Sequence, residues 1–259
     1  MKSPYLDKKV SRLVGKAIWD YRLIEDGDKI LVALSGGKDS VALLKLLCER
    51  RKFVPIDYEI KALTVDLGFG KLDLSRLRSF VEGLGVEFIL KETQIGPKAH
   101  SPSNPEIPCF LCSRWRRKVF FETAVELGCN KLALGHNKDD IIETFFINLL
   151  YAGEISTMVP RQELFHGRLT IIRPLALLDE REIRSYVRLH RLPELQDGCP
   201  TKGKTKRREV RFLLEELQRM DKRIKGNIFH ALSNVKQEYL LRGEITPGEH
   251  LWVRARGAP

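Results

Sequence analysis

Residues 29–40 read Lys-Ile-Leu-Val-Ala-Leu-Ser-Gly-Gly-Lys-Asp-Ser, and this stretch decides the fold. The apolar run 29–35 has the length and composition of a buried strand, and residues 41–50 follow a helical pattern. Gly36 and Gly37 between them allow a tight turn. A buried strand that turns through glycines into a helix is typical of the first unit of a parallel α/β sheet.

Four further apolar runs alternate with helical patterns. Strands are predicted at 57–66, 86–92, 131–135 and 170–173, and helices at 74–84, 113–127, 140–151 and 179–189. This alternation indicates βαβ units, so we predict an α/β fold with an open parallel sheet and helices on both faces, Rossmann-like in type. Proline-rich loops are predicted at 93–108 and 192–206, and helical patterns at 208–220 and 224–241 form a small C-terminal helical appendage.

The pattern divides the chain into an N-terminal helical segment (1–28), an α/β domain (29–190) and a C-terminal helical and basic region (191–259). No apolar run approaches the ~20 residues that a membrane span needs. The first ten residues lack the layout of a secretion signal. We therefore expect a cytoplasmic protein without a membrane partner.

Composition narrows the class of protein. The 259 residues include 45 Lys plus Arg against 34 Asp plus Glu, a formal net charge of +11, which suggests an acidic partner such as nucleic acid. The same charge can also serve only to keep the protein in solution. Five cysteines, an odd number, argue against a disulfide framework.

The glycine loop is a candidate anion site. Two glycines let the backbone approach an anion closely, and the start of the following helix offers free N–H groups to it. The spacing is neither that of a Walker A loop nor that of a dinucleotide-binding fingerprint. The candidate residues are Ser35, Gly36, Gly37, Lys38, Asp39 and Ser40.

A second motif, Gly135-His136-Asn137-Lys138-Asp139-Asp140, ends the fourth predicted strand. Its carboxylates can hold a magnesium ion or orient a reacting base, and either can also be a helix N-cap. The carboxyl ends of parallel strands share one edge of a sheet. We therefore expect this motif to lie beside the glycine loop.

Cys109 and Cys112 form a C-x-x-C pair ahead of a basic helical stretch. Alone, such a pair is half a zinc site, a redox dithiol or part of an iron–sulfur site. Cys199 is the other cysteine in a polar, irregular stretch, whereas Cys48 and Cys129 fit core positions. Three thiolates on a cubane cluster leave one iron open for hydrosulfide or substrate.

These motifs together resemble a known family. Residues 35–40 resemble the pyrophosphate-binding loop of the PP-loop ATP pyrophosphatases, and 135–140 resemble the second signature of the tRNA-thiolating members. The cysteine pair, the basic helix and the third cysteine are similar to the tRNA 2-thiocytidine synthetase (tRNA-cytidine(32) 2-sulfurtransferase) branch. That branch usually has a second C-x-x-C where Cys199 stands alone here. The resemblance covers about 10–240.

The resemblance implies an ATP-dependent tRNA sulfurtransferase that adenylates the C2 oxygen of a pyrimidine, cytidine 32 above all, and replaces it with sulfur. Lys38 and Arg116 would neutralise charge on the phosphates, and Asp39 and Asp139 would carry Mg²⁺. Gly135, His136 and Asp140 would complete the ATP site. Cys109, Cys112 and Cys199 would hold a [4Fe-4S] cluster, with sulfur supplied as sulfide or by a cysteine desulfurase.

The tRNA partner would need basic contacts. The candidates are Arg114, Arg117, Lys118, Lys202, Lys204, Lys206, Arg207 and Arg208. Phe110 and Trp115 can either stack on an extruded base or pack within a helix. A charge run can equally be a solvated surface.

Alternatives stay open at this point. A tRNA 2-thiouridine thiolase would use similar chemistry, and a lysidine-synthetase-like ligase would share both loops but need no cysteine triad. A nucleotide-regulated iron–sulfur or zinc binding module would not turn over at all. A mechanism without a cluster would place a persulfide on Cys109 or Cys199. Members of the family are often dimers, so a homodimer is one expectation.

Overall fold

The computed structural model describes residues 4–70, 73–195, 199–200 and 206–240. A six-stranded sheet has the order β3-β2-β1-β4-β6-β5. The strands are β1 (Asp28–Ala33), β2 (Tyr58–Asp66), β3 (Glu87–Glu92), β4 (Lys131–Ala133), β5 (Arg161–Leu164) and β6 (Leu169–Ile172). All pairs but one are parallel, and the predicted α/β fold is confirmed.

The exception is β5, which no apolar run predicted. Its sequence, Arg-Gln-Glu-Leu, lacks the apolar residues of the other strands, and it pairs antiparallel with β6 at the edge of the sheet. Phe165, His166 and Gly167 turn the chain between the two strands, all with positive φ angles. An edge strand pairs with one neighbouring strand and is open to solvent on its other side, so its residues need not be apolar. The amino-acid composition of β5 therefore gives no sign that it is a strand.

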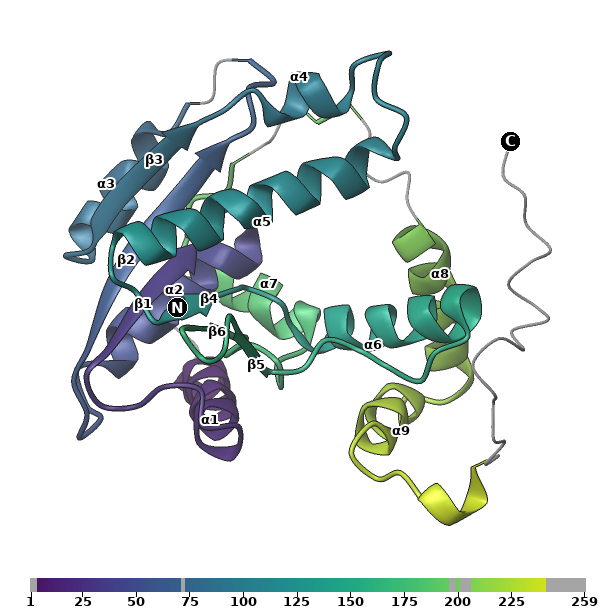
Figure 1. Ribbon diagram of the computed structural model, residues 1–259. Helices are drawn as coiled ribbons and strands as arrows, with labels where there is room; N and C mark the ends of the chain where they lie inside the picture. The colour runs from purple at the N-terminus through teal and green to yellow at the C-terminus, as the bar shows by residue number, and fades with distance from the viewer. Residues whose placement is uncertain (1–3, 71–72, 196–198, 201–205, 241–259) are drawn as a thin grey trace.

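Helices cover both faces of the sheet (Figure 1). On one face, α2 (Lys38–Arg50), α3 (Ser75–Gly83) and α7 (Glu180–Leu189) pack with α1 (Pro4–Asp20) into the larger core. On the other face lies α5 (Pro108–Glu126). Alternate residues of β1 serve the two layers, Ile30 and Val32 in the first and Leu31 and Ala33 in the second.

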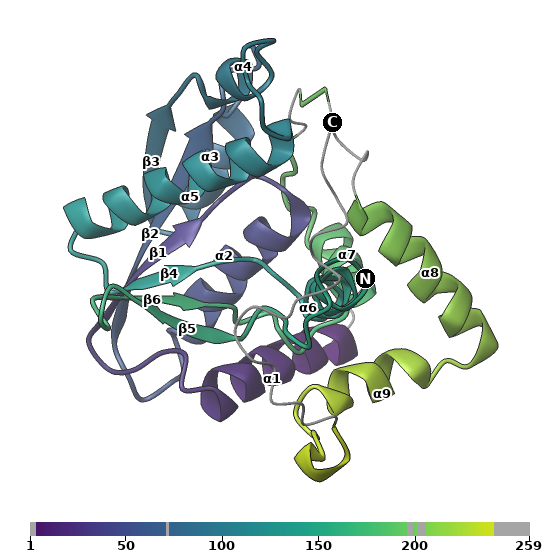
Figure 2. The same ribbon diagram turned by 45° about the vertical axis from the view of Figure 1, so that its right-hand side comes forward.

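Three helices extend beyond the carboxyl edge of the sheet, as Figures 1 and 2 show: α6 (Lys138–Ile147), α8 (Lys206–Met220) and α9 (Ile224–Ala231). A short π-helix, η1 (Asn148–Ala152), continues α6. Within the described residues, no helix is both long and apolar enough to cross a bilayer.

Several predicted boundaries differ from the observed ones. The loop predicted at 93–108 contains a short helix, α4 (Ile95–Ala99), and α5 begins five residues earlier than its apolar pattern, because Pro108 suits a first turn. The last predicted helix stops at Ala231, where Ser233 and Asn234 begin a turn. A short 3₁₀ turn, η2 (Gln237–Tyr239), follows.

The residue before the glycine loop is fixed by β2. The N–H of Leu34 donates to the carbonyl of Leu63 at 2.8 Å, and the hydroxyl of Thr64 donates to the carbonyl of Leu34 at 2.8 Å. Thr64 is 2% exposed, so this side-chain bond is shielded from water. β2 therefore fixes the position from which the loop departs.

Thr64→Val tests this anchor. Loss of the hydroxyl leaves a buried carbonyl without its donor, so we expect the free energy of unfolding to fall by about 1–3 kcal/mol in urea titrations. Thr64→Ser keeps the donor and serves as the control. A valine variant as stable as the wild type would contradict the anchor.

Candidate functional site

The glycine loop, residues 35–40, leaves β1 and becomes the first turn of α2. Gly36 has φ +78°, and a Cβ there would lie 2.5 Å from Cδ1 of Leu195, whose N–H donates to the Gly36 carbonyl at 2.9 Å. Gly37 is the N-cap of α2 and provides no side-chain cap, so the helix start can present N–H groups to an anion. The two serines at the ends of the loop are hydrogen-bonded at 3.2 Å.

The second motif packs directly against this loop. Gly135 follows β4, and a Cβ there would lie 3.0 Å from the backbone carbon of Asp39 and the backbone nitrogen of Ser40. Asn137 caps α6 by accepting the N–H groups of the two aspartates that follow. Its amide nitrogen also donates to Asp39 Oδ1 at 3.2 Å. The predicted neighbourhood of the two motifs is observed, and Asn137, which the sequence left without a role, joins them.

Lys38 lies between two carboxylates. Its Nζ is 2.9 Å from Asp39 Oδ2 and 3.0 Å from Glu180 Oε1, at the start of α7. Burial opposes the charged amine, but the two carboxylates outweigh it and raise the pKa of Lys38. Burial raises the pKa of Asp39, and the neighbouring Lys38 counteracts this only in part. In the absence of a ligand, the charge of Lys38 is therefore balanced by Asp39 and Glu180, and a bound phosphate could take their place.

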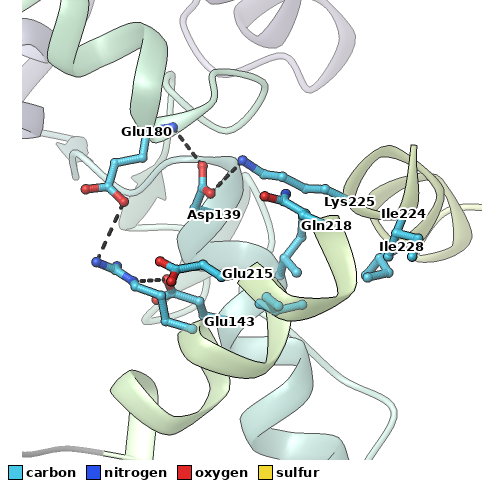
Figure 3. Close-up of a pocket in the computed structure, with 11 residues that line it drawn as sticks. Asp139, Glu143, Glu180, Glu215, Gln218, Ile224, Lys225 and Ile228 are labelled. Carbon is cyan, nitrogen blue, oxygen red and sulfur yellow. Dashed lines mark hydrogen bonds and ion pairs between the residues drawn. The ribbon is translucent and has the colours of Figure 1, made fainter. Parts of the chain in front are cut away.

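Asp139 joins three helices (Figure 3). Its Oδ2 accepts the backbone N–H of Glu180 at 2.7 Å, and its Oδ1 is 2.5 Å from Nζ of Lys225 in α9. Lys225 is also 2.8 Å from Oδ1 of Asp179. Burial works against the charged amine, yet the bonds to both aspartates outweigh it and raise the pKa of Lys225. A cavity of about 120 Å³ lies beside these groups, between α6, α8 and α9.

Arginines of α8 complete the ionic contacts. Arg207 donates to Asp140 at 2.9 Å, and Arg211 donates to Glu143 at 2.7 Å and lies 3.7 Å from Glu180. Glu143 is only 2% exposed. Asp140 also closes the capping box of α6. The N-cap considered for Asp139 or Asp140 from the sequence is therefore wrong, because Asn137 takes that position and Asp140 is the N3 residue of the capping box. Arg207 faces the Asp140 carboxylate.

His136 lies among arginines. Burial, and then the charge of Arg173, lower the pKa of His136 to about 3, and Arg116 and Arg117 of α5 add to the shift. Arg173 Nε is 3.4 Å from Nδ1 of the imidazole. His136 is thus neutral at physiological pH. The charges of Arg207 in α8 and of the two α5 arginines all contribute to this shift, and α5 itself packs against β4.

The cysteine pair occupies the first turn of α5. Cys109 and Cys112 are partly buried and form no disulfide, and they lie three residues apart and so on one side of the helix. Cys199 is also partly buried and forms no disulfide. Among the residues that the structure describes, no group of three or more His, Cys, Asp or Glu side chains has an arrangement that could hold a metal ion.

The residues predicted to contact RNA fall into three sets. Arg114 is paired with Glu106 at 2.7 Å, and Lys118 lies 3.6 Å from Glu122 on the same exposed stretch of α5, which also includes Arg117. Lys206, Arg207 and Arg208 begin α8, with Lys206 3.1 Å from Glu209. Lys202 and Lys204 lie outside the described residues.

Several charged residues of this site were absent from the sequence prediction, Glu143 and Asp179 as well as Glu180 and Lys225. Glu180 and Lys225 contact Lys38 and Asp139, from segments about 40 to 140 residues away along the chain. The only local signal for Glu180 is the acidic pair with Asp179 ahead of a helical pattern, which reads equally as an N-terminal cap. Nothing local distinguishes Lys225 from other lysines.

Comparison with known proteins identifies strong similarities. A family model for the PP-loop domain matches residues 5–217. A tRNA-cytidine(32) 2-sulfurtransferase of Geobacter sulfurreducens is 38% identical over 241 residues, covering 92% of this chain and 94% of its own. One from Alkalilimnicola ehrlichii is 37% identical over 260 residues, with 94% and 82% covered.

A solved structure shares the fold. The U34-tRNA thiolase of Methanococcus maripaludis, determined with its [4Fe-4S] cluster, superimposes with a TM-score of 0.73 and 23% identity, covering 91% of this chain and 80% of its own. The two proteins therefore share one fold over nearly the whole of this chain.

Gly135→Ala tests the contact between the two loops. The added methyl meets backbone atoms of α2, and overpacking of this kind costs about 1–3 kcal/mol. We expect the Kd for ATP, measured by calorimetry, to rise about tenfold, which corresponds to about 1.4 kcal/mol. Gly83→Ala, where nothing lies within 4 Å, is the matched control. Equal affinities in both variants would show that the contact does not shape the loop.

Proposed function

The chain belongs to the PP-loop family, and we propose that it is an enzyme that thiolates tRNA at the expense of ATP, forming 2-thiocytidine at position 32. The relatives that match it along nearly their whole length carry that name. In this proposal the base oxygen attacks the α-phosphate of ATP and releases pyrophosphate. Sulfur then displaces AMP from the adenylated base.

One observation supports the proposal above the others. Gly135 brings the second motif against the first turn of α2, and the next residue, His136, is under the charge of Arg116 and Arg117 in α5. The same helix begins with Cys109 and Cys112. We infer that the nucleotide loop and the thiol-bearing helix serve one site, because a reaction that uses both ATP and sulfur needs them together.

The glycine loop would bind the phosphates of ATP. Its residues 35–40 and the start of α2 offer N–H and hydroxyl donors, and Lys38 would exchange Glu180 for phosphate oxygens. Arg116 would neutralise charge that develops as pyrophosphate leaves. Gly135, His136 and Asp140 complete the proposed ATP site.

Magnesium would be held by carboxylates. Asp39 and Asp139 are the proposed ligands, and each is already paired with an ammonium group, Lys38 and Lys225 respectively. A triphosphate attracts both ammonium groups and so frees carboxylate oxygens for the ion, which prefers oxygen ligands. Each metal contact then replaces an ion pair and leaves no charge unpaired.

The thiols fit an iron–sulfur cluster by their chemistry. Cys109 and Cys112 lie in the first turn of α5, and neither is in a disulfide. Cys199 is the proposed third ligand. When bound, a [4Fe-4S] cluster with three protein thiolates supplies one open iron that can accept sulfide.

The remaining partners follow from the reaction. Sulfur would come as sulfide or from a cysteine desulfurase, and tRNA would meet the basic residues of α5 and the start of α8. A cytoplasmic location and a homodimer complete the proposal.

Nucleoside analysis of tRNA tests the function directly. We expect a strain that lacks the gene to lose 2-thiocytidine, and expression of the wild type to restore it. Lys38→Ala should not restore it, because the phosphates lose their cation. An unchanged nucleoside profile would refute the proposal, and selective loss of 2-thiouridine would assign the enzyme to the uridine thiolases.

Anaerobic purification tests the cluster. We expect a brown protein that contains iron, and Cys199→Ala should lose both the colour and the iron because only two thiolates remain. Cys129→Ala removes a buried cysteine of the core and should keep both. A colourless wild type with bound zinc would contradict the cluster.

A further inference from the structure

A second basic surface lies where α7 and α9 begin, away from the basic residues that the sequence indicated. A groove of about 710 Å³ opens there. Its lining side chains include six cations and three carboxylates, and only Gln218 and Gly226 carry no charge. The cations are Lys138, Arg181, Arg184, Lys222, Arg223 and Lys225.

The carboxylates of the groove are already occupied. Asp139 and Asp179 pair with Lys225, and Glu180 pairs with Lys38 at 3.0 Å and with Arg184 at 2.9 Å. Burial opposes the charged form of Glu180, but the bond to Lys38 outweighs it and lowers the pKa of Glu180. Glu180 therefore stays charged at neutral pH, and all three acids are paired with cations of the protein.

Three cations remain available to a ligand. Arg181 and Lys222 are exposed, and neither forms an ion pair within residues 4–70, 73–195, 199–200 and 206–240. Among the described residues, Arg223 pairs only with Asp221 of its own turn, and its side chain is 83% exposed, against 17% for Lys225. The groove thus has a partly buried floor of ion pairs and an exposed cationic rim.

Helix starts add to the positive field. The groove is lined by residues at the beginning of α6, α7 and α9, whose N-termini each carry partial positive charge. No large apolar side chain is among the lining residues, so the groove offers nothing to a lipid chain or to the apolar residues of a peptide. A regularly spaced polyanion fits this lining.

We infer that the rim formed by Arg181, Lys222 and Arg223 contacts the phosphate backbone of the RNA substrate. The inference rests on the proposed function for the identity of the RNA. Glu180 lines the groove and also contacts Lys38 of the glycine loop, so the groove opens beside the ATP site. In Figures 1 and 2, α5 and α9 lie on opposite sides of α6. RNA held at both would have the reaction site between its two contacts.

Neutralisation of the rim tests this surface. The variant Arg181→Ala/Lys222→Ala/Arg223→Ala is compared with the wild type for binding of an unmodified tRNA transcript, across a salt series and without ATP. We expect affinity to fall at least tenfold in low salt. The slope of log affinity against log salt should become shallower by about 2–3, because each lost phosphate contact removes about 0.7–0.9.

The matched control is Arg51→Ala/Lys52→Ala/Arg168→Ala. It removes the same number of positive charges from exposed residues near the amino ends of the parallel strands, away from the groove. Arg51 and Lys52 follow α2, and Arg168 precedes β6. We expect its affinity for tRNA to change less than about twofold. In both variants the melting temperature and the Kd for ATP should match the wild type, which shows that the fold and the glycine loop are intact.

The outcomes separate the two proposals. A wild type that binds no tRNA contradicts the proposed function, whereas a wild type that binds tRNA together with a rim variant of equal affinity overturns only the groove. Equal losses in the rim and control variants would show that net charge alone matters. If the rim variant lost binding to phosphatidylserine vesicles but not to tRNA, the groove would be a membrane contact and the inference wrong.

Discussion

The site depends on the absence of one side chain. Gly135 lets the loop after β4 lie against the backbone of the first turn of α2. A Cβ at this position would lie 3.0 Å from the backbone carbon of Asp39. Two segments about 100 residues apart are thereby in direct contact, and the Asn137 amide donates a hydrogen bond to Asp39 across it. The anchoring of Leu34 by β2 fixes the other end of the glycine loop. Shape and hydrogen bonding thus determine where charges meet.

The charges form a chain from that edge to the C-terminal helices. Lys38 contacts Glu180, the backbone of Glu180 bonds to Asp139, and Asp139 pairs with Lys225 of α9. Each group therefore has a partner before any ligand arrives. Because each charged group has a partner, the protein avoids the large desolvation cost of an isolated buried charge. A phosphate that displaces a carboxylate from a lysine keeps that lysine paired.

Local signals were sufficient for the five parallel strands of the sheet and for both loops. The apolar runs of β1 and β2 and the glycines between strand and helix are patterns within a few residues, so the sequence alone predicts them. The charged strand β5 carries no such pattern. The partners Glu180 and Lys225 depend on which helices meet in space, and that depends on the packing of segments far apart in the chain. The dual use of Asp140 in the capping box and as the partner of Arg207 is visible only once α8 is placed.

The C-terminal helices α8 and α9 are held against the rest of the protein mainly by ion pairs between side chains. Of α8 only Val210 is buried, and no residue of α9 is, whereas Arg207, Arg211 and Lys225 all reach carboxylates of α6 and α7. Screening by salt weakens exposed ion pairs far more than apolar packing. Ionic strength thus acts on this protein twice, on how firmly its own helices are docked and on how tightly a polyanion binds beside them. A single salt titration combines both processes, and only the difference between two variants with the same helical docking isolates the second.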